Sequence, residues 1–414
     1  MITSTAAFIV TCVCSIQQAP PPATAPSVNA AFPRPSIYLP QQIMVYDVDR
    51  WSTWLNLAAP QALFFKNAWQ EYETRWKDDV KRFGPEVERL QILVGELSMG
   101  EMHGAFADAI ADLRALERKA TETLLANDAQ LFDQLNAYLA ASQQPALAHV
   151  VAARNRHVGF AQPFSICPAS IEIHKVVQQS NISAESAGVL TECLHEYDLA
   201  IAPLLIRLRD SRWQQSGRLS AIDGEIAQSS RRHETVRVAE LLEERTRILR
   251  QHAQMERRIA MVNLDFSERV QALLQLPFRD YFRARFDAKA YPRIYPDRTD
   301  PSRLLRDLVT AAAFDGERLA TARSILETHA GQVATVNKQL CVLEDEAEDT
   351  FAANMMGTGR EGIDTKSARL HGRRRELHRA AIEQTRAILP PTVVSANERR
   401  IASALRVLAE TPIE

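Results

Sequence analysis

Apolar side chains recur at strict seven-residue intervals in the middle of the chain, and this repeat constrains the fold more than any other feature. The repeat consists of Leu241, Ile248, Met255 and Val262. Seven residues make about two helical turns, so these side chains fall on one stripe of an α-helix and favour packing along a neighbouring helix. We predict a long helix over residues 216–274. Its seam would bind a protein surface, either another segment of this chain or a second copy.

Two earlier segments show the helical spacing of three and four residues. Apolar side chains form one stripe along residues 60–83 and another along residues 105–141, and each stripe predicts a long amphipathic helix. Gly84 and Pro85 are expected to end the first of these helices. The chain has only 14 glycines and no extended alternation of apolar and polar residues, which disfavours a sheet. The sequence therefore predicts an all-α fold.

The helical segments also show a weak internal similarity. Residues 65–72 align with residues 190–197, both ending in Glu-Tyr, and residues 131–139 align with residues 266–274. A fainter third pair covers two further segments, 323–336 and 380–389. Self-similarity at a fixed period is typical of repeated architectures. We predict long antiparallel helical hairpins, in two to three repeated helix-pair units with coiled-coil-like packing.

Irregular stretches suggest the boundaries between these units. We predict a signal peptide over residues 1–19, a proline-rich linker over residues 20–44, and three helical units. The units cover residues 45–160, 171–290 and 301–414. The connector over residues 291–301 is rich in proline, and we expect its tyrosines, Tyr291 and Tyr295, to pack on the helix ends.

The N-terminal segment bears on the compartment. Residues 6–14 are short and apolar, and a proline-rich stretch follows them, which favours export to the periplasm or secretion. No Lys or Arg precedes Phe8, so cytoplasmic residence and a buried N-terminal element stay open. Cys12 follows a sequence that loosely resembles a lipoprotein box, so a lipid anchor there is a further alternative. No stretch reaches the length of about 18–20 apolar residues that spans a bilayer, and no transmembrane segment is expected.

Charge and cysteine content exclude some classes of protein. The formal net charge is −2, which gives no overall attraction to nucleic acid. The basic cluster at residues 373–375 and the histidines His371 and His378 are expected to lie on solvated helix faces. Five cysteines are present, of which Cys167 and Cys193 could pair in an oxidising compartment, and they do not form a disulfide framework.

One short segment has the composition of a metal site. Met99, Met102 and His103 lie within five residues of one another. Thioether and imidazole ligands suit Cu(I), so these residues are a candidate metal site. The alternative is a loop between helices whose methionines cap the core.

The common catalytic motifs are absent from the sequence. The sequence contains no Gly-x-Ser-x-Gly and no phosphate-binding loop. A Gly-x-Gly-x-x-Gly does occur at residues 357–362, but a helical pattern precedes it where dinucleotide-binding proteins have a strand. We interpret it as a hinge. We therefore expect a protein that is not an enzyme and has no cofactor.

The helix pairs and one short motif resemble the Spy/CpxP-like extracytoplasmic helical proteins, whose mark is a Leu-Thr-x-x-Gln turn after a long helix. The matching stretch here is Leu139 to Gln143, with Ala140 in place of the threonine. The resemblance implies periplasmic helical hairpins that bind other proteins, as a chaperone or in the envelope stress response. The alternative is a structural coiled-coil scaffold that self-associates through the Leu241–Val262 seam.

Overall fold

A computed structural model describes residues 39–97, 103–180, 182–295, 301–353 and 361–410. Contacts divide the chain into two units, residues 1–34 and residues 35–414, and every described residue belongs to the second. The predicted signal peptide and Cys12 lie outside the described residues, as does most of the proline-rich linker.

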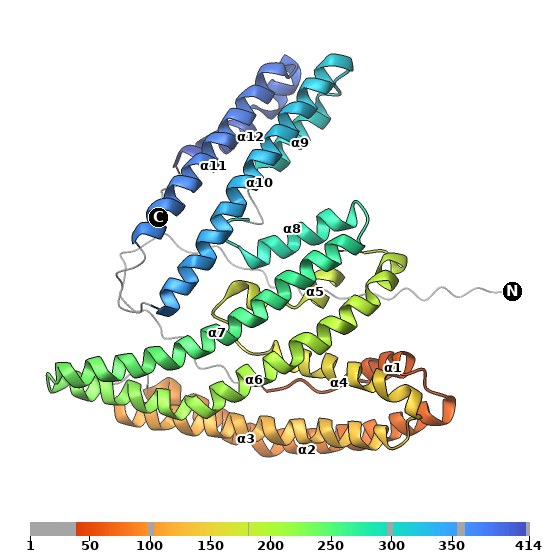
Figure 1. The fold of residues 1–414 in the computed structure, drawn as a ribbon, viewed down its shortest axis with the longest axis vertical. Helices are drawn as coiled ribbons and strands as arrows, with labels where there is room; N and C mark the ends of the chain where they lie inside the picture. Colours follow the sequence, from red (N-terminus) through yellow and green to blue (C-terminus); the bar gives the residue numbers. More distant parts are fainter. Residues whose placement is uncertain (1–38, 98–102, 181, 296–300, 354–360, 411–414) are drawn as a thin grey trace. The chain divides into compact units, whose positions relative to one another are not determined.

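The described part of the chain is all-helical and contains no strand, as the sequence predicts (Figure 1). No described helix is long and apolar enough to cross a membrane. Within the described ranges, two short 3₁₀ helices, η1 (Ala141–Gln143) and η2 (Cys167–Ser170), accompany twelve α-helices. The α-helices are α1 (Val45–Trp54), α2 (Ala59–Leu97), α3 (His103–Asn136), α4 (Gln144–Gly159), α5 (Ile173–Gln179), α6 (Ala184–Arg231), α7 (Thr235–Leu273), α8 (Phe278–Ala290), α9 (Pro301–Ala311), α10 (Gly316–Ala353), α11 (Glu361–Ile388) and α12 (Pro391–Glu410).

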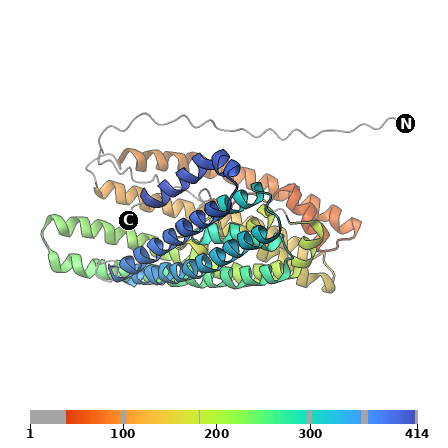
Figure 2. The same cartoon turned by 90° about the horizontal axis from the view of Figure 1, so that it is seen from above.

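The most extensive contacts between elements are those within three long pairs of helices: α2 with α3, α6 with α7, and α10 with α11. The two views both show α6 beside α7 (Figures 1 and 2). Helices α1 to α4 share a core that contains several aromatic side chains, among them Trp51, Phe65 and Tyr72. A second, larger core lies among α5, α6, α7, α8 and α10. A third joins α9, α11 and α12.

Helix α4 crosses α6 very closely at its C-terminal end. A Cβ added to Gly159 would lie 2.5 Å from the Cβ of Leu205, a distance at which the backbones would have to move apart. The glycine therefore allows the close crossing. Because the chain leaves α4 here, the crossing also fixes where residues 160–166 pass over α6 and α7.

The connector after α8 is held from two sides. Tyr291 and Ile294 are buried in the larger core, and Tyr295 packs against it, as expected for tyrosines that cover helix ends. From α11, Arg374 Nη1 donates to the carbonyl oxygen of Ile294 at 2.5 Å and to Asn337 Oδ1 at 3.2 Å. The prediction of a wholly solvated basic face is thus wrong for Arg374, because its guanidinium satisfies a backbone carbonyl between helices.

The histidine prediction is also wrong in part. His378 is 6% exposed, and its Nδ1 lies 2.9 Å from His329 Nε2 of α10. The two imidazoles therefore form a buried hydrogen bond between α10 and α11. His371 is half-buried rather than solvated, because the α11 face that carries both histidines packs toward α10.

Two predicted helix boundaries differ from the structure. The helix expected to end at Gly84 continues through Pro85 to the end of α2, since Phe83 and Leu90 on either side of it are buried and keep the helix in register. The single helix expected over residues 216–274 is instead two helices, α6 and α7. The break falls at His233, whose φ of 59° lies in the left-handed region that a right-handed helix cannot include.

Candidate functional site

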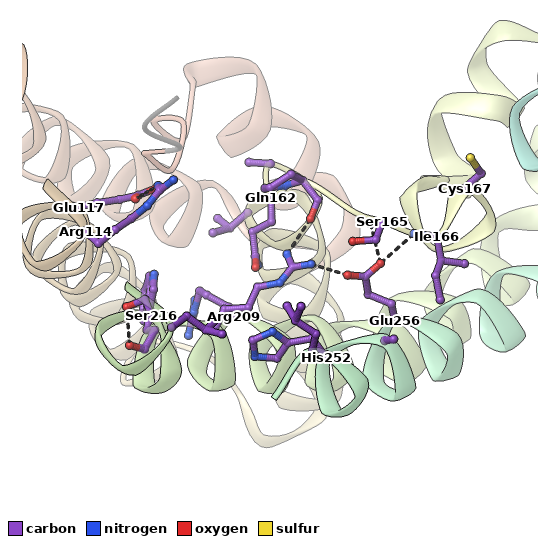
Figure 3. A pocket seen from close by; sticks show the side chains of 18 of the residues that line it. Arg114, Glu117, Gln162, Ser165, Ile166, Cys167, Arg209, Ser216, His252 and Glu256 are labelled. Atoms are coloured by element: carbon purple, nitrogen blue, oxygen red, sulfur yellow. Dashed lines mark hydrogen bonds and ion pairs between the residues drawn. The ribbon is translucent and has the colours of Figure 1, made fainter. Parts of the chain in front are cut away.

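A cavity of about 730 Å³ lies among helices α3, α6 and α7 and the segment that follows α4 (Figure 3). Residues from the connector after α8 and from α10 complete its lining. Volumes of roughly 300–1,000 Å³ are typical of sites for small molecules. Much of the wall is apolar: Pro40, Val158, Ala161, Pro163, Ile166, Trp213, Leu219, Leu249, Ala253, Pro292 and Ala347.

An ion pair between the partly buried Arg212 and the buried Glu256 links α6 to α7 at the wall of this cavity. Arg212 Nη2 donates to Glu256 Oε1 at 2.5 Å, and Arg212 Nη1 donates to the carbonyl oxygen of Pro163 at 2.6 Å. Glu256 Oε2 accepts from the backbone nitrogens of Ser165 and Ile166 at 2.7 and 2.9 Å. The carboxylate therefore fixes the loop after α4 over the cavity, and Figure 3 shows this bonding.

The other charged groups of the lining also have partners of opposite sign. On α3, Arg114 pairs with Glu117. On α6, Arg209 lies 3.0 Å from Asp210, and its guanidinium carbon lies 4.8 Å from the ring centre of Trp213. The charges that face the cavity are thus compensated within the protein.

The last charged residues of the lining, Arg293 and Glu344, come from the connector after α8 and from α10. Burial raises the pKa of Glu344, and the positive charge of Arg293 partly opposes that rise. Their charges therefore also offset each other.

Three polar atoms of the lining have no hydrogen-bond partner in the protein. They are Thr121 Oγ1 of α3, Nε2 of Gln162 from the segment after α4, and His252 Nε2 of α7. A buried polar group without a partner costs about 1–3 kcal/mol. Three such groups belong to residues that line one cavity, where a bound molecule or water would be placed to supply the missing hydrogen bonds.

His252 is a neutral imidazole in this setting. Burial lowers the pKa of His252, and the nearby positive charge of Arg212 lowers it further. A hydrogen bond to the backbone of Ser211 raises the pKa of His252. A hydrogen bond has this effect when the imidazole N–H is the donor. Because Nε2 has no hydrogen-bond partner, we assign the bond to Ser211, and with it the proton of the neutral ring, to Nδ1, which leaves Nε2 as an acceptor.

Two other buried ion-pair networks lie near α4 and serve packing. Arg154 Nε donates to Asp128 Oδ2 at 2.7 Å, which ties α4 to α3. Arg156 pairs with both Glu172 and Asp198, which ties α4 to α5 and α6. In the first network one guanidinium pairs with one carboxylate, and in the second Lys175 also pairs with Glu172, so each carboxylate has a cationic partner within the protein.

The residues that the sequence singled out lie elsewhere. Met99 and Met102 fall outside the described residues, as does the side chain of His103. Within the described ranges no group of three His, Cys, Asp or Glu side chains could hold a metal ion. Among the described residues, Cys167, Cys193 and Cys341 form no disulfide, so the possible pairing of Cys167 with Cys193 is not present.

The Leu241–Val262 seam packs within this chain. Leu241 and Ile248 form a buried cluster with Ile222 of α6. Met255 and Val262 are partly buried against the larger core. The neighbouring helix that the seven-residue repeat requires is thus α6.

The cavity was not predicted from the sequence, although the sequence contains a signal for it. His252 follows Ile248 by four residues, and Glu256 follows after four more, so both lie on the same face of α7 as the buried part of the seam. Polar residues on a buried helix face are uncommon and mark a specific interaction. Trp213, Arg209 and Arg212 sit on α6 opposite that face, and only the folded structure brings them to it.

The fold and the cavity together define the class: an all-helical protein with a largely apolar, charge-compensated cavity. Comparison with protein families, with curated proteins and with solved structures finds no match to this chain.

Proposed function

We propose that the chain is a non-enzymatic binding protein that holds a predominantly apolar molecule in the cavity among α3, α6 and α7. The observation that carries the proposal is the cavity itself, with its apolar wall and its three unpartnered polar atoms. The buried carboxylate of Glu256 supports binding rather than proton transfer, because Arg212 and two backbone N–H groups already use both of its oxygens.

The experiment is a titration with N-phenyl-1-naphthylamine, an uncharged dye whose fluorescence rises in an apolar site. Ala253 lines the cavity, so Ala253→Trp should fill part of it and abolish the fluorescence increase. Ala239 is exposed on the same helix, and Ala239→Trp is the matched control that should bind the dye like the parent protein. Circular dichroism establishes that both variants fold. Equal dye binding by the two variants would overturn the proposal.

A second candidate function is the binding of other proteins, in the manner of a chaperone. The observation that favours it is a group of exposed apolar side chains at the turn between α7 and α8: Leu273 (43% exposed), Leu276 (61%) and Tyr281 (56%). Replacing all three with serine should lower the protection of a reduced, unfolded protein such as α-lactalbumin from aggregation. Unchanged protection would count against this candidate.

The finer architecture expected from the sequence belongs to the same proposal. The pairs α2–α3, α6–α7 and α10–α11 would be repeated antiparallel hairpins, and their extensive mutual contacts support this. Self-association through the Leu241–Val262 seam is less favoured, since α6 covers much of it.

Location outside the cytoplasm is proposed on the apolar run at residues 6–14 and the prolines that follow it. Mass spectrometry of the N-terminus from the native host tests it. Cleavage near Ala19 or a lipid on Cys12 would support export, whereas an intact N-terminus would support cytoplasmic residence.

A further inference from the structure

The unpartnered atoms of the cavity define which hydrogen bonds a ligand could make. Thr121 is 3% exposed and His252 is 7% exposed, so bulk water does not reach their side chains freely. Thr121 Oγ1 can donate or accept, Gln162 Nε2 can only donate, and His252 Nε2 accepts in the tautomer fixed by Ser211. Because these atoms come from α3, from the segment after α4 and from α7, they surround the cavity from different sides.

The charged groups that line the cavity indicate whether its ligand carries a charge. Arg114, Arg209 and Arg212 each face a carboxylate within the protein. A ligand carboxylate would have to compete with these partners, and a ligand cation would meet guanidinium groups. Burial of an uncompensated charge costs far more than burial of a hydroxyl. The lining therefore favours a ligand without charge.

We propose that the cavity selects an uncharged, largely apolar molecule that carries a hydroxyl group, and that this hydroxyl donates to His252 Nε2. Thr121 Oγ1 and Gln162 Nε2 bind a second oxygen of the ligand. In a ligand with a single oxygen, they bind the hydroxyl oxygen itself where it lies between the two side chains. This inference rests on the proposed binding function and adds the chemical class of the ligand. Aromatic and terpenoid alcohols belong to this class.

The experiment compares three probes with one apolar body: 4-phenylphenol, biphenyl-4-carboxylate and biphenyl. At pH 7.5 the first is neutral with a hydroxyl, the second is an anion and the third has no polar group. Their dissociation constants are measured by displacement of N-phenyl-1-naphthylamine from the full chain. We expect 4-phenylphenol to bind about tenfold more tightly than either of the others, the ratio typical for one buried hydrogen bond.

Two variants assign the selectivity to named atoms. His252→Phe keeps a ring of similar size but removes the acceptor, so it should bind 4-phenylphenol about tenfold more weakly and leave biphenyl unchanged. Thr121→Val removes a hydroxyl with little change in shape, and it should reduce the preference for 4-phenylphenol without unfolding α3. Thr123→Val, on the same helix but outside the cavity lining, is the matched control and should change nothing.

The outcomes separate this inference from the function on which it rests. If all three probes bind equally and Ala253→Trp abolishes binding, the cavity binds ligands but its polar atoms are satisfied by water, and the inference is overturned. Tighter binding of the carboxylate would overturn it as well. If N-phenyl-1-naphthylamine does not bind to the protein, no probe can displace it, and the proposed function itself fails.

Discussion

Arg212 of α6 and the buried Glu256 of α7 form a part-buried ion pair with an N–O distance of 2.5 Å, and the same carboxylate accepts two backbone N–H groups from the loop after α4. The pair thus joins three elements that are far apart in the sequence. It also stands at the wall of the cavity, so the residues that shape the cavity stabilise the packing of α6 against α7 as well.

Loss of Glu256 should destabilise the protein strongly. Glu256→Ala leaves the partly buried Arg212 guanidinium without its carboxylate and removes the acceptor of Ser165 and Ile166. Breaking one partner of a fully buried pair costs about 3–5 kcal/mol, so we expect a loss of about 2–4 kcal/mol here. Urea unfolding followed by circular dichroism measures the change in the free energy of unfolding. Glu243→Ala, at an exposed position of α7, should cost about 0.5 kcal/mol or less. A similar, small loss in both variants would contradict the account of the ion pair.

The Leu241–Val262 seam on α7 should contribute to the stability of the fold rather than to self-association of the chain. Leu241 is fully buried against Ile222, so Leu241→Ala should lower the free energy of unfolding by about 2–5 kcal/mol. Light scattering should give the same mass for the variant as for the parent protein. Val236→Ala, at a position 74% exposed on the same helix, should change neither quantity. Dissociation of an oligomer on replacing Leu241 would instead support the self-associating scaffold.

His371 should make stability depend on pH. Burial and the neighbouring Arg374 and Arg375 lower its pKa to about 4, against about 6.5 for an unfolded histidine. Between these values the unfolded chain binds a proton that the folded chain does not, so stability falls as the pH falls from about 6.5 to 4. In His371→Gln the slope of melting temperature against pH should be shallower over this window. His233→Asn, whose side chain tolerates the left-handed conformation at this exposed position, should keep the slope of the parent protein.

Arg374 should contribute to stability much more than its neighbour Arg373. Arg374→Ala removes the donor to the Ile294 carbonyl and to Asn337, and each lost bond to a charged donor is worth about 1.5–3 kcal/mol. Arg373 is exposed, and Arg373→Ala should stay within about 0.5 kcal/mol of the parent protein. Thermal unfolding of the two variants compares them, and equal melting temperatures would show that the Ile294 contact adds nothing.

Local patterns were sufficient to predict that the long segments are helical. The three- and four-residue spacing along residues 60–83 and 105–141 predicts α2 and α3, and the seven-residue repeat correctly places α7 against another helix. The same patterns could not show where α6 and α7 separate, because a histidine at position 233 carries no helix-breaking signal. The continuation of α2 through Pro85 also depends on burial of its neighbours, which is a property of the folded chain.

The candidate site could not be predicted from local sequence patterns, for a different reason. The lining of the cavity combines Thr121, Gln162, Arg212 and His252, which come from four separate segments. No motif links them, and their missing hydrogen bonds become visible only when the backbone is in place. The polar residues on the buried face of α7 were the one local sign of the site.

The most direct test of the central claim is a crystal structure of the full chain with 4-bromo-4′-hydroxybiphenyl, recorded at the bromine absorption edge. The account predicts an anomalous peak inside the cavity among α3, α6 and α7, with the hydroxyl oxygen within hydrogen-bond distance of His252 Nε2. Bromine peaks that lie only on the outer surface, with the cavity filled by ordered water, would contradict it.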